Sequence, residues 1–225
     1  MNRVLFNIAL DASLPGDLNK AVTIAGFENI IKEKLSGINA QDNPFLLNIS
    51  GIPGAGKSTY AAELLQTGEM HDLVYVSFDE IMELHPGYQS EVKQIQDGEH
   101  SYVIAYETVF ARWEIPARIA GYELIRRAVL NRQSILFEHS SATPYHVELF
   151  KDLMLHHRYA VHMHYLETSI GIAKKRIKER EQFQIENLGY TRIIPAIYLE
   201  QRLKTLEEYL PKFQEICTSF KRIHT

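Results

Sequence analysis

Short apolar runs alternate with longer amphipathic stretches along most of the chain. The runs at 45–49, 73–78, 134–137 and 160–166 have the length of buried strands, and a weaker run at 220–223 fits a last strand. The stretches between them carry apolar positions at helical spacing. Strands that alternate with helices predict an α/β fold, in which a mostly parallel sheet is covered by helices on both faces.

The amphipathic stretches between the strands are predicted to form helices. They are expected at 17–35, 58–65, 100–131, 144–157, 170–181 and 195–217. Pro116 should kink the longest helix or divide it in two, and the stretch His85-Pro86-Gly87-Tyr88 should form a turn. Residues 1–17 have a weak pattern and are expected to form an N-terminal arm, which leaves 18–225 as one domain.

A glycine-rich stretch, Gly51-Ile52-Pro53-Gly54-Ala55-Gly56-Lys57-Ser58, follows the first strand and matches the P-loop pattern G-x-x-x-x-G-K-S. Such a loop turns backbone N–H groups toward phosphate oxygens at the start of a helix. Lys57 can reach the β- and γ-phosphates, and the Ser58 hydroxyl can bind Mg²⁺. The residues expected to hold ATP or GTP are Gly51, Pro53, Gly54, Ala55, Gly56, Lys57, Ser58 and Thr59.

The P-loop also narrows the fold class. A strand before the motif and a helix after it are the context that a nucleotide-binding loop requires, and they argue against a glycine-rich turn with a surface lysine. We therefore expect a three-layer αβα sandwich of the P-loop NTPase type, with helical insertions.

Composition limits the partners. With 45% apolar residues and a formal net charge of −4, the chain has a sizeable core and no general basic field for nucleic acid or anionic lipid. The single cysteine, Cys217, excludes an internal disulfide. No stretch has the length of a membrane span or the core of a signal peptide, so a cytoplasmic site is expected.

Acidic residues follow two of the predicted strands, at the edge of the sheet where ligands bind. Asp79 comes directly after the second strand. It is interpreted as a general base for an acceptor hydroxyl, as a Walker B element together with Glu80, or as the N-cap of the next helix. Glu138 and Ser140 follow the third strand and are candidates for contact with the substrate.

Phosphoryl transfer needs positive charge around the moving phosphate, because the transition state spreads negative charge over its oxygens. Arg176 and Arg180 share one face of the helix at 170–181, and Arg192 follows in the next loop. A solvated charged helix is the alternative reading of this run. The histidines at 156, 157, 162 and 164 lack ligand spacing and are not expected to bind a metal.

The order of these motifs resembles the zeta-toxin family of P-loop kinases. The matching features are the P-loop, then Phe78-Asp79-Glu80-Ile81 with His85-Pro86-Gly87-Tyr88 shortly after, then a strand ending at Glu138, an arginine helix, and Thr191-Arg192-Ile193-Ile194-Pro195. The resemblance implies an enzyme that uses ATP to phosphorylate a hydroxyl of UDP-N-acetylglucosamine. It also implies a small helical antitoxin as a protein partner.

Roles carried over from the resemblance fall on individual residues of this chain. Lys57 and Ser58 would hold the triphosphate and Mg²⁺, and Asp79 would be the base. Arg180 or Arg176, together with Arg192, would clamp the phosphates. His85, Glu123, Glu138 and Ser140 would contact the nucleotide or nucleotide-sugar acceptor.

One position departs from the family pattern of Glu-Gly-Thr followed by a residue and an arginine. This chain has Glu138-His139-Ser140-Ser141-Ala142, so Ser140 replaces the threonine and Ala142 stands where the arginine is expected. Alanine cannot hold an anionic acceptor. Acceptors that remain open include other nucleotide cofactors such as NAD. Two alternatives of another class are a nucleotide-dependent regulatory ATPase and a kinase of nucleic-acid ends.

Overall fold

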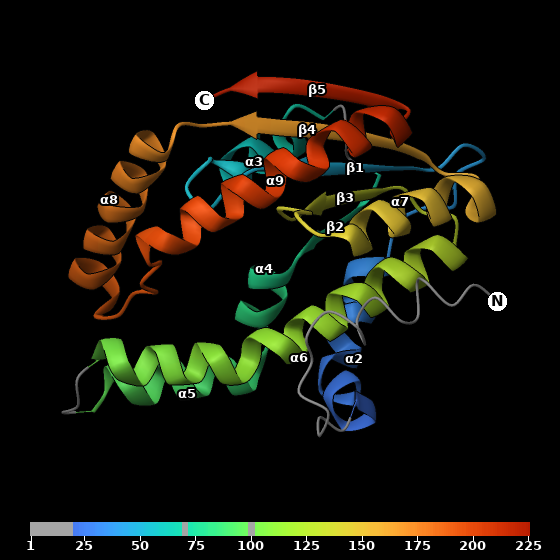
Figure 1. Ribbon diagram of the computed structural model, residues 1–225. Helices are drawn as coiled ribbons and strands as arrows, with labels where there is room; N and C mark the ends of the chain where they lie inside the picture. The colour runs from blue at the N-terminus through green and yellow to red at the C-terminus, as the bar shows by residue number, and fades with distance from the viewer. Residues whose placement is uncertain (1–19, 69–71, 99–101) are drawn as a thin grey trace.

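The strands form one sheet at the centre of the molecule. A computed structural model describes residues 20–68, 72–98 and 102–225, so the arm expected at 1–17 lies outside the described residues. The sheet has five parallel strands in the order β2-β3-β1-β4-β5 (Figure 1). The strands are β1 (Phe45–Ser50), β2 (Val74–Ser77), β3 (Ile135–Glu138), β4 (Ala160–Glu167) and β5 (Ser219–His224).

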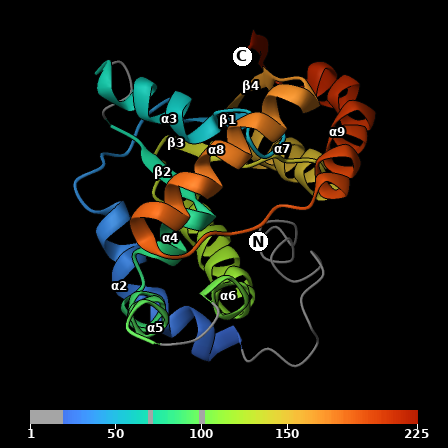
Figure 2. The same ribbon diagram turned by 90° about the vertical axis from the view of Figure 1, so that its left-hand side faces the viewer.

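Helices connect the strands and cover both faces of the sheet. They are α2 (Lys20–Leu35), α3 (Lys57–Gln66), α4 (Phe78–Glu83), α5 (Pro86–Gln96), α6 (Tyr102–Leu130), α7 (Pro144–His157), α8 (Ile170–Leu188) and α9 (Ala196–Ile216). Figure 2 shows α3 on one side of the sheet and α7 and α9 on the other. This arrangement confirms the α/β fold with three layers that the alternating pattern predicted.

A helical layer extends the fold beyond the β2 edge. The long helix α6 packs against α2, α4 and α5, and it reaches the sheet through β2 (Figure 1). Because α4 begins directly after β2, these contacts fix the direction in which the chain leaves the sheet. The described parts of the insertion between β2 and β3 therefore form a wall beside the carboxyl ends of the strands.

The core lies between the sheet and the helices on each face. Side chains such as Leu46, Phe137 and Val161 are fully buried on neighbouring strands. Phe150 of α7 and Phe213 of α9 are also buried, and their rings lie 5.4 Å apart between centroids. Burial of several large side chains supplies the main stabilising term for such a sheet.

The structure contradicts the turn expected at Pro86 and, of the two outcomes expected at Pro116, the division of the helix. Pro86 does not form a turn but is the first residue of α5. A proline is tolerated there because the N–H that it lacks would be unpaired at a helix start. His85 is the N-cap, and its side chain accepts a hydrogen bond from the Gly87 N–H. Pro116 lies inside α6 without dividing it. Packing of α6 against three other helices holds it continuous across the proline.

Other helix limits also differ from the pattern. The second strand ends at Ser77, so Phe78 and Asp79 belong to the first turn of α4 rather than to the strand. The basic helix runs on to Leu188, where Gly189 ends it in a left-handed conformation with φ 77°. The loop before α9 is correspondingly shorter than expected.

Gly121→Ala should destabilise the protein by about 1–3 kcal/mol, because overpacking a tight contact forces its neighbours to move. A Cβ at Gly121 of α6 would lie 2.4 Å from ring atoms of Phe78, the residue that precedes Asp79. Urea denaturation followed by circular dichroism measures the change.

Gly171→Ala on α8 is the matched control, because a Cβ there meets nothing closer than 4.0 Å and alanine favours helices. Equal stability of the Gly121 variant and the wild type would contradict the tight packing of α6 against α4.

Candidate functional site

A cleft of about 530 Å³ opens at the carboxyl ends of the central strands. Its walls come from the P-loop, from the start of α4, from the segment after β3, and from the helices α6, α8 and α9. The sequence-predicted residues that line it are Pro53, Gly54, Gly56, Lys57, Ser58, Thr59, Asp79, Glu138, Ser140, Arg176, Arg180 and Arg192. The fold therefore brings residues from distant parts of the chain to one place.

Two glycines give the P-loop its shape. Gly54 and Gly56 have φ values of 79° and 89°, which are strained for other residues. Gly54 is a variable position of the motif, but a Cβ there would lie 2.7 Å from the Ala173 carbonyl oxygen of α8. Glycine at this position lets α8 pack directly against the phosphate-binding loop.

The side chain of Lys57 folds back onto the P-loop. Its Nζ donates hydrogen bonds to the carbonyl oxygens of Gly51 and Ile52, both at 3.1 Å. Burial lowers the pKa of Lys57, while the carboxylates of Glu138 and Asp79 act in the opposite direction. The ammonium group thus rests on two carbonyl groups beside the space where phosphates would lie.

The side chains of Ser58 and Glu138 meet through a hydrogen bond. β3 lies beside β1, with Ile49 paired to Glu138, so the end of β3 meets the start of α3. The Ser58 hydroxyl donates to Glu138 Oε1 at 2.7 Å, and the Tyr75 hydroxyl donates to Glu138 Oε2. Burial, with the nearby Glu138 charge, raises the pKa of Tyr75, so this phenol remains a donor. Hydroxyl and carboxylate oxygens suit Mg²⁺.

Asp79 faces the cleft from the first turn of α4. Its side chain is 66% exposed, and its Oδ1 lies 3.9 Å from Arg192 Nη1. The guanidinium of Arg192 also lies 3.8 Å from the centroid of the Phe110 ring. The N-cap of α4 is Ser77, so the interpretation of Asp79 as the N-cap was wrong. Glu80 forms an ion pair of 2.6 Å with Lys34.

The helix α8 presents its basic face to the P-loop. Ala173 and Ile177 are buried on that side, and Arg176 and Arg180 line the cleft. Arg176 Nη1 lies 3.5 Å from the Ala55 carbonyl oxygen. These contacts favour a phosphate-facing helix over a helix surrounded by solvent.

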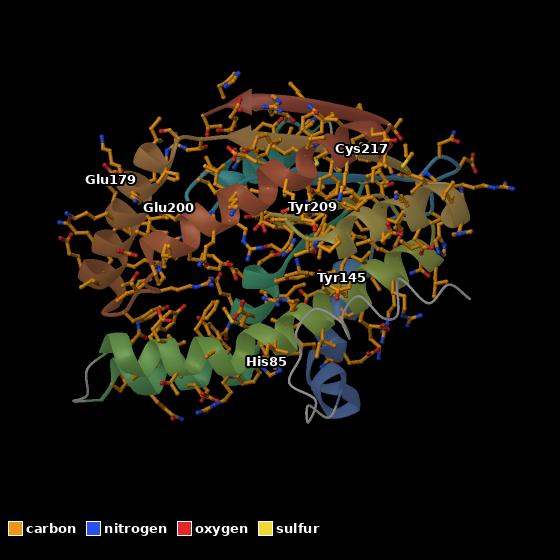
Figure 3. All side chains as sticks on the ribbon, in the orientation of Figure 1. His85, Tyr145, Glu179, Glu200, Tyr209 and Cys217 are labelled. Atoms are coloured by element: carbon orange, nitrogen blue, oxygen red, sulfur yellow. The ribbon has the colours of Figure 1, made fainter. Side chains whose placement is uncertain are left out.

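His85 and Glu123 are not among the described residues that line the cleft. The ring of His85 packs on Trp113 with centroids 4.4 Å apart, and Figure 3 shows His85 beside α6, away from α8, where Glu179 is labelled. Glu123 forms ion pairs with Arg126 and Arg127. Their expected contact with the acceptor finds no support in this geometry.

Helix periodicity explains the position of Glu123. Residues nine apart lie on opposite faces of a helix at 100° per residue, so Glu123 points away from the side that Glu114 occupies. Glu114 and Arg118 line the cleft from α6 and form an ion pair of 2.7 Å. Glu114 and Arg118 are four residues apart, a spacing typical of an ion pair on one helix face. This spacing was the sequence signal that could have identified them.

Two further residues of the cleft were missed, Tyr198 and Arg202, which lie one turn apart at the start of α9. His139, a candidate because it follows the third strand, also lines the cleft. The Arg202 guanidinium donates to the Tyr198 hydroxyl and lies 5.0 Å from the ring centroid. An arginine near the start of the last helix gave no local signal, because only the tertiary fold brings α9 to the cleft.

Two histidines behind the third strand stay uncharged. The rings of His139 and His146 stack with centroids 4.6 Å apart. Burial lowers the pKa of His146 to about 3, and burial with the neighbouring charges of His146, Arg118 and Arg202 lowers the pKa of His139 well below its usual value. His146 is also fixed by Thr143 and by the Tyr122 hydroxyl at 3.0 Å.

A parallel sheet with a P-loop after its central strand and a cleft lined by lysine and arginine defines a P-loop kinase fold. A family model described as Zeta toxin matches residues 29–224. The chain belongs to the zeta toxin family, and this membership places it among nucleotide-dependent kinases. Comparison with curated proteins gave no match.

Solved structures show the same fold. The PezAT chromosomal toxin-antitoxin system of Streptococcus pneumoniae has a TM-score of 0.65 and 16% identity, over 92% of this chain and 78% of that chain. The AvrRxo1-ORF1:AvrRxo1-ORF2 complex has a TM-score of 0.56 and 11% identity, over 99% of this chain and 63% of that chain. Within the described residues, no helix is both long and apolar enough to cross a membrane.

The free energy of unfolding should fall as the pH drops from about 6.5 toward 3. In this range the unfolded state binds protons on His139 and His146, whereas the folded state keeps both residues neutral. His146 contributes up to about 1.4 kcal/mol per pH unit in this window, and His139 acts in the same direction. His146→Gln should therefore reduce the pH dependence of the free energy of unfolding, measured by urea denaturation between pH 7.5 and 4.5.

His156→Gln on the same helix is the control, because His156 is exposed and its removal should leave the slope as it is. An unchanged slope in His146→Gln would refute the assignment of His146 as a neutral residue of the folded state.

Proposed function

We propose that the protein transfers the γ-phosphate of ATP to a hydroxyl group of a small nucleotide-type acceptor. The observation that carries this proposal is one cleft in which an exposed aspartate, Asp79, faces the P-loop residues Lys57 and Ser58. Membership of the zeta toxin family favours transfer to an acceptor over simple hydrolysis, a reaction that can also use a carboxylate base. A kinase needs one within reach of the acceptor hydroxyl.

The step needs a base, a donor and positive charge. Asp79 accepts the proton of the acceptor hydroxyl as a new bond forms between the oxygen of that hydroxyl and the γ-phosphorus of ATP. The bond from the γ-phosphorus to the bridging oxygen breaks at the same time, and ADP leaves. Lys57, Arg176 or Arg180, and Arg192 stabilise the negative charge that spreads over the phosphate oxygens.

Mg²⁺ would be held by Ser58 and Glu138, since their oxygens already lie 2.7 Å apart. When bound, this ion neutralises phosphate charge and orients the triphosphate. Tyr75 orients Glu138 through its hydrogen bond. The Walker B position beside the P-loop strand therefore goes to Glu138, while Glu80 is engaged by Lys34.

The family resemblance makes UDP-N-acetylglucosamine the first acceptor to test, and NAD the second. Ala142 is fully buried, so it offers the acceptor no charged contact. As PezAT is a toxin-antitoxin system, we also propose a small protein antitoxin as a partner. Because ATP is the donor, we place the reaction in the cytoplasm.

Lys57→Ala and Asp79→Asn should each lower the rate of phosphate transfer by at least about 100-fold, because they remove a phosphate contact and the general base. The assay incubates the protein with labelled ATP, Mg²⁺ and a panel of UDP-N-acetylhexosamines, NAD, nucleosides and short RNA. Chromatography then identifies the labelled product.

Asp97→Asn, an exposed acidic residue at the end of α5, is the control and should keep the wild-type rate. Full activity of Asp79→Asn would refute the assigned base. Release of free phosphate with no labelled acceptor, stimulated by a protein partner, would favour the regulatory ATPase instead.

Glu138→Gln and Ser58→Ala should raise the Mg²⁺ concentration needed for half-maximal transfer by about tenfold, because each loses an oxygen ligand or its charge. A Mg²⁺ titration at saturating ATP and acceptor measures this effect. An unchanged Mg²⁺ requirement in both variants would exclude the pair as the metal site.

A further inference from the structure

The residue that follows the last strand reaches the P-loop. β5 runs parallel to β4 toward the start of α8, so both strands end at the edge of the sheet where the cleft lies (Figure 1). Directly after β5, the Thr225 backbone N–H donates to the Glu167 carbonyl oxygen at 3.2 Å. Arg222 of β5 also forms an ion pair of 3.0 Å with the Glu167 side chain. These contacts hold Thr225 at the carboxyl edge of the sheet.

The Thr225 hydroxyl joins three separate elements. It donates to the carbonyl oxygen of Ala55 in the P-loop at 3.2 Å, and it accepts from Arg176 Nη1 of α8 at 3.4 Å. Its third partner is the hydroxyl of Thr168, directly after β4. A hydroxyl has one proton and two lone pairs, a carbonyl can only accept, and a guanidinium can only donate. Thr168 is therefore the donor in the third bond, and every hydrogen-bonding position of the Thr225 hydroxyl is filled.

The bond to Ala55 sets the direction of an N–H group of the P-loop. The peptide between Ala55 and Gly56 is trans, so its C=O and its N–H point in opposite directions. Gly56 lines the cleft. Because Thr225 holds the Ala55 carbonyl on its own side, the Gly56 N–H is turned toward the space where the P-loop receives phosphate oxygens.

The bond to Arg176 fixes a cation without neutralising it. The Arg176 guanidinium contacts the neutral oxygens of Thr225 and Ala55, and within the described residues no carboxylate lies at ion-pairing distance from it. The neighbouring Lys174 and Lys175 both form ion pairs with glutamates. A carboxylate in place of the Thr225 hydroxyl would compete with phosphate for the guanidinium. The hydroxyl leaves the whole charge of Arg176 for a phosphate group.

We propose that Thr225 is a positioning residue of the phosphate-binding site, which acts through the Gly56 N–H and the Arg176 guanidinium. This proposal rests on the proposed kinase function, because it assigns Thr225 a part in binding the phosphates of ATP. Thr225 is not among the described residues that line the cleft, so it acts through the groups that it holds. β5 thus supports the P-loop from behind as well as forming the edge of the sheet.

The test compares Thr225→Val with Thr225→Ser. Valine has nearly the shape of threonine but lacks the hydroxyl, whereas serine keeps it. Calorimetry measures the binding of adenylyl imidodiphosphate, a non-hydrolysable ATP analogue, in the presence of Mg²⁺. Thr225→Val should raise the Kd of this analogue about tenfold, because it releases the Ala55 carbonyl and the Arg176 guanidinium. Thr225→Ser retains the donor and both acceptor positions and should stay within about twofold of the wild type.

Thr218→Val is the matched control. Thr218 lies at the opposite end of β5, where its hydroxyl accepts a hydrogen bond of 3.1 Å from the Val161 N–H. Its loss should lower the free energy of unfolding and leave the Kd of the analogue unchanged. An equal Kd in the wild type and in Thr225→Val would overturn the proposal. A Kd that rises as much in Thr225→Ser or in Thr218→Val as in Thr225→Val would overturn it as well.

Steady-state transfer gives a second readout, which a loss of stability alone would not move. Thr225→Val should raise the KM for ATP about tenfold and leave the KM for the acceptor unchanged, because the contact that it removes serves the nucleotide. A lower kcat with an unchanged KM for ATP would contradict the positioning role.

The two assays separate this proposal from the kinase proposal. Weaker binding of the analogue in Thr225→Val, with no transfer to any acceptor, would keep the positioning residue and reject the kinase. Transfer that requires Asp79, with the same Kd for the analogue in the wild type and in Thr225→Val, would keep the kinase and reject the positioning residue.

Discussion

The parallel pairing of β3 with β1 is the constraint on which the site depends. It brings Glu138 to the hydroxyl of Ser58, although the two residues are far apart in the chain. Tyr75, from the next strand, then fixes the other oxygen of the same carboxylate. Three neighbouring elements thus meet at one carboxyl group, and the chemistry of the P-loop is set by strand order as much as by the glycine-rich motif itself.

The insertion between β2 and β3 forms a second wall of the cleft. The insertion between β2 and β3 folds into α4, α5 and α6, and it presents Asp79, Glu114 and Arg118 across from the nucleotide loop. Each of the two sides therefore has its own cations. Arg176 and Arg180 line the cleft from α8, whereas Arg118 and Arg202 line it from α6 and α9.

Local sequence predicted the strands, the P-loop and the arginine face of α8 well, because each depends on spacing within a few residues. Residues that reach the cleft only through tertiary contacts could not be predicted from the local sequence. Glu123 was chosen on α6 although its face is opposite that of Glu114, and Arg202 gave no local signal because only the packing of α9 brings it to the cleft. The turn expected at Pro86 is a helix start, since the His85 side chain supplies the cap. The roles assigned to the individual residues stay predictions.

The contact between Gly54 and Ala173 has a mechanical consequence. Since no side chain separates the P-loop from α8, a tilt of the helix would turn about this contact near its N-terminal end. From Ala173 to Leu188 the helix is roughly 22 Å long at 1.5 Å per residue, so a tilt of about 5° at the pivot moves its far end by about 2 Å. That end carries the exposed apolar side chains of Phe183 and Ile185. A tilt too small to disturb the phosphate loop would therefore move these apolar side chains on the outside of the molecule.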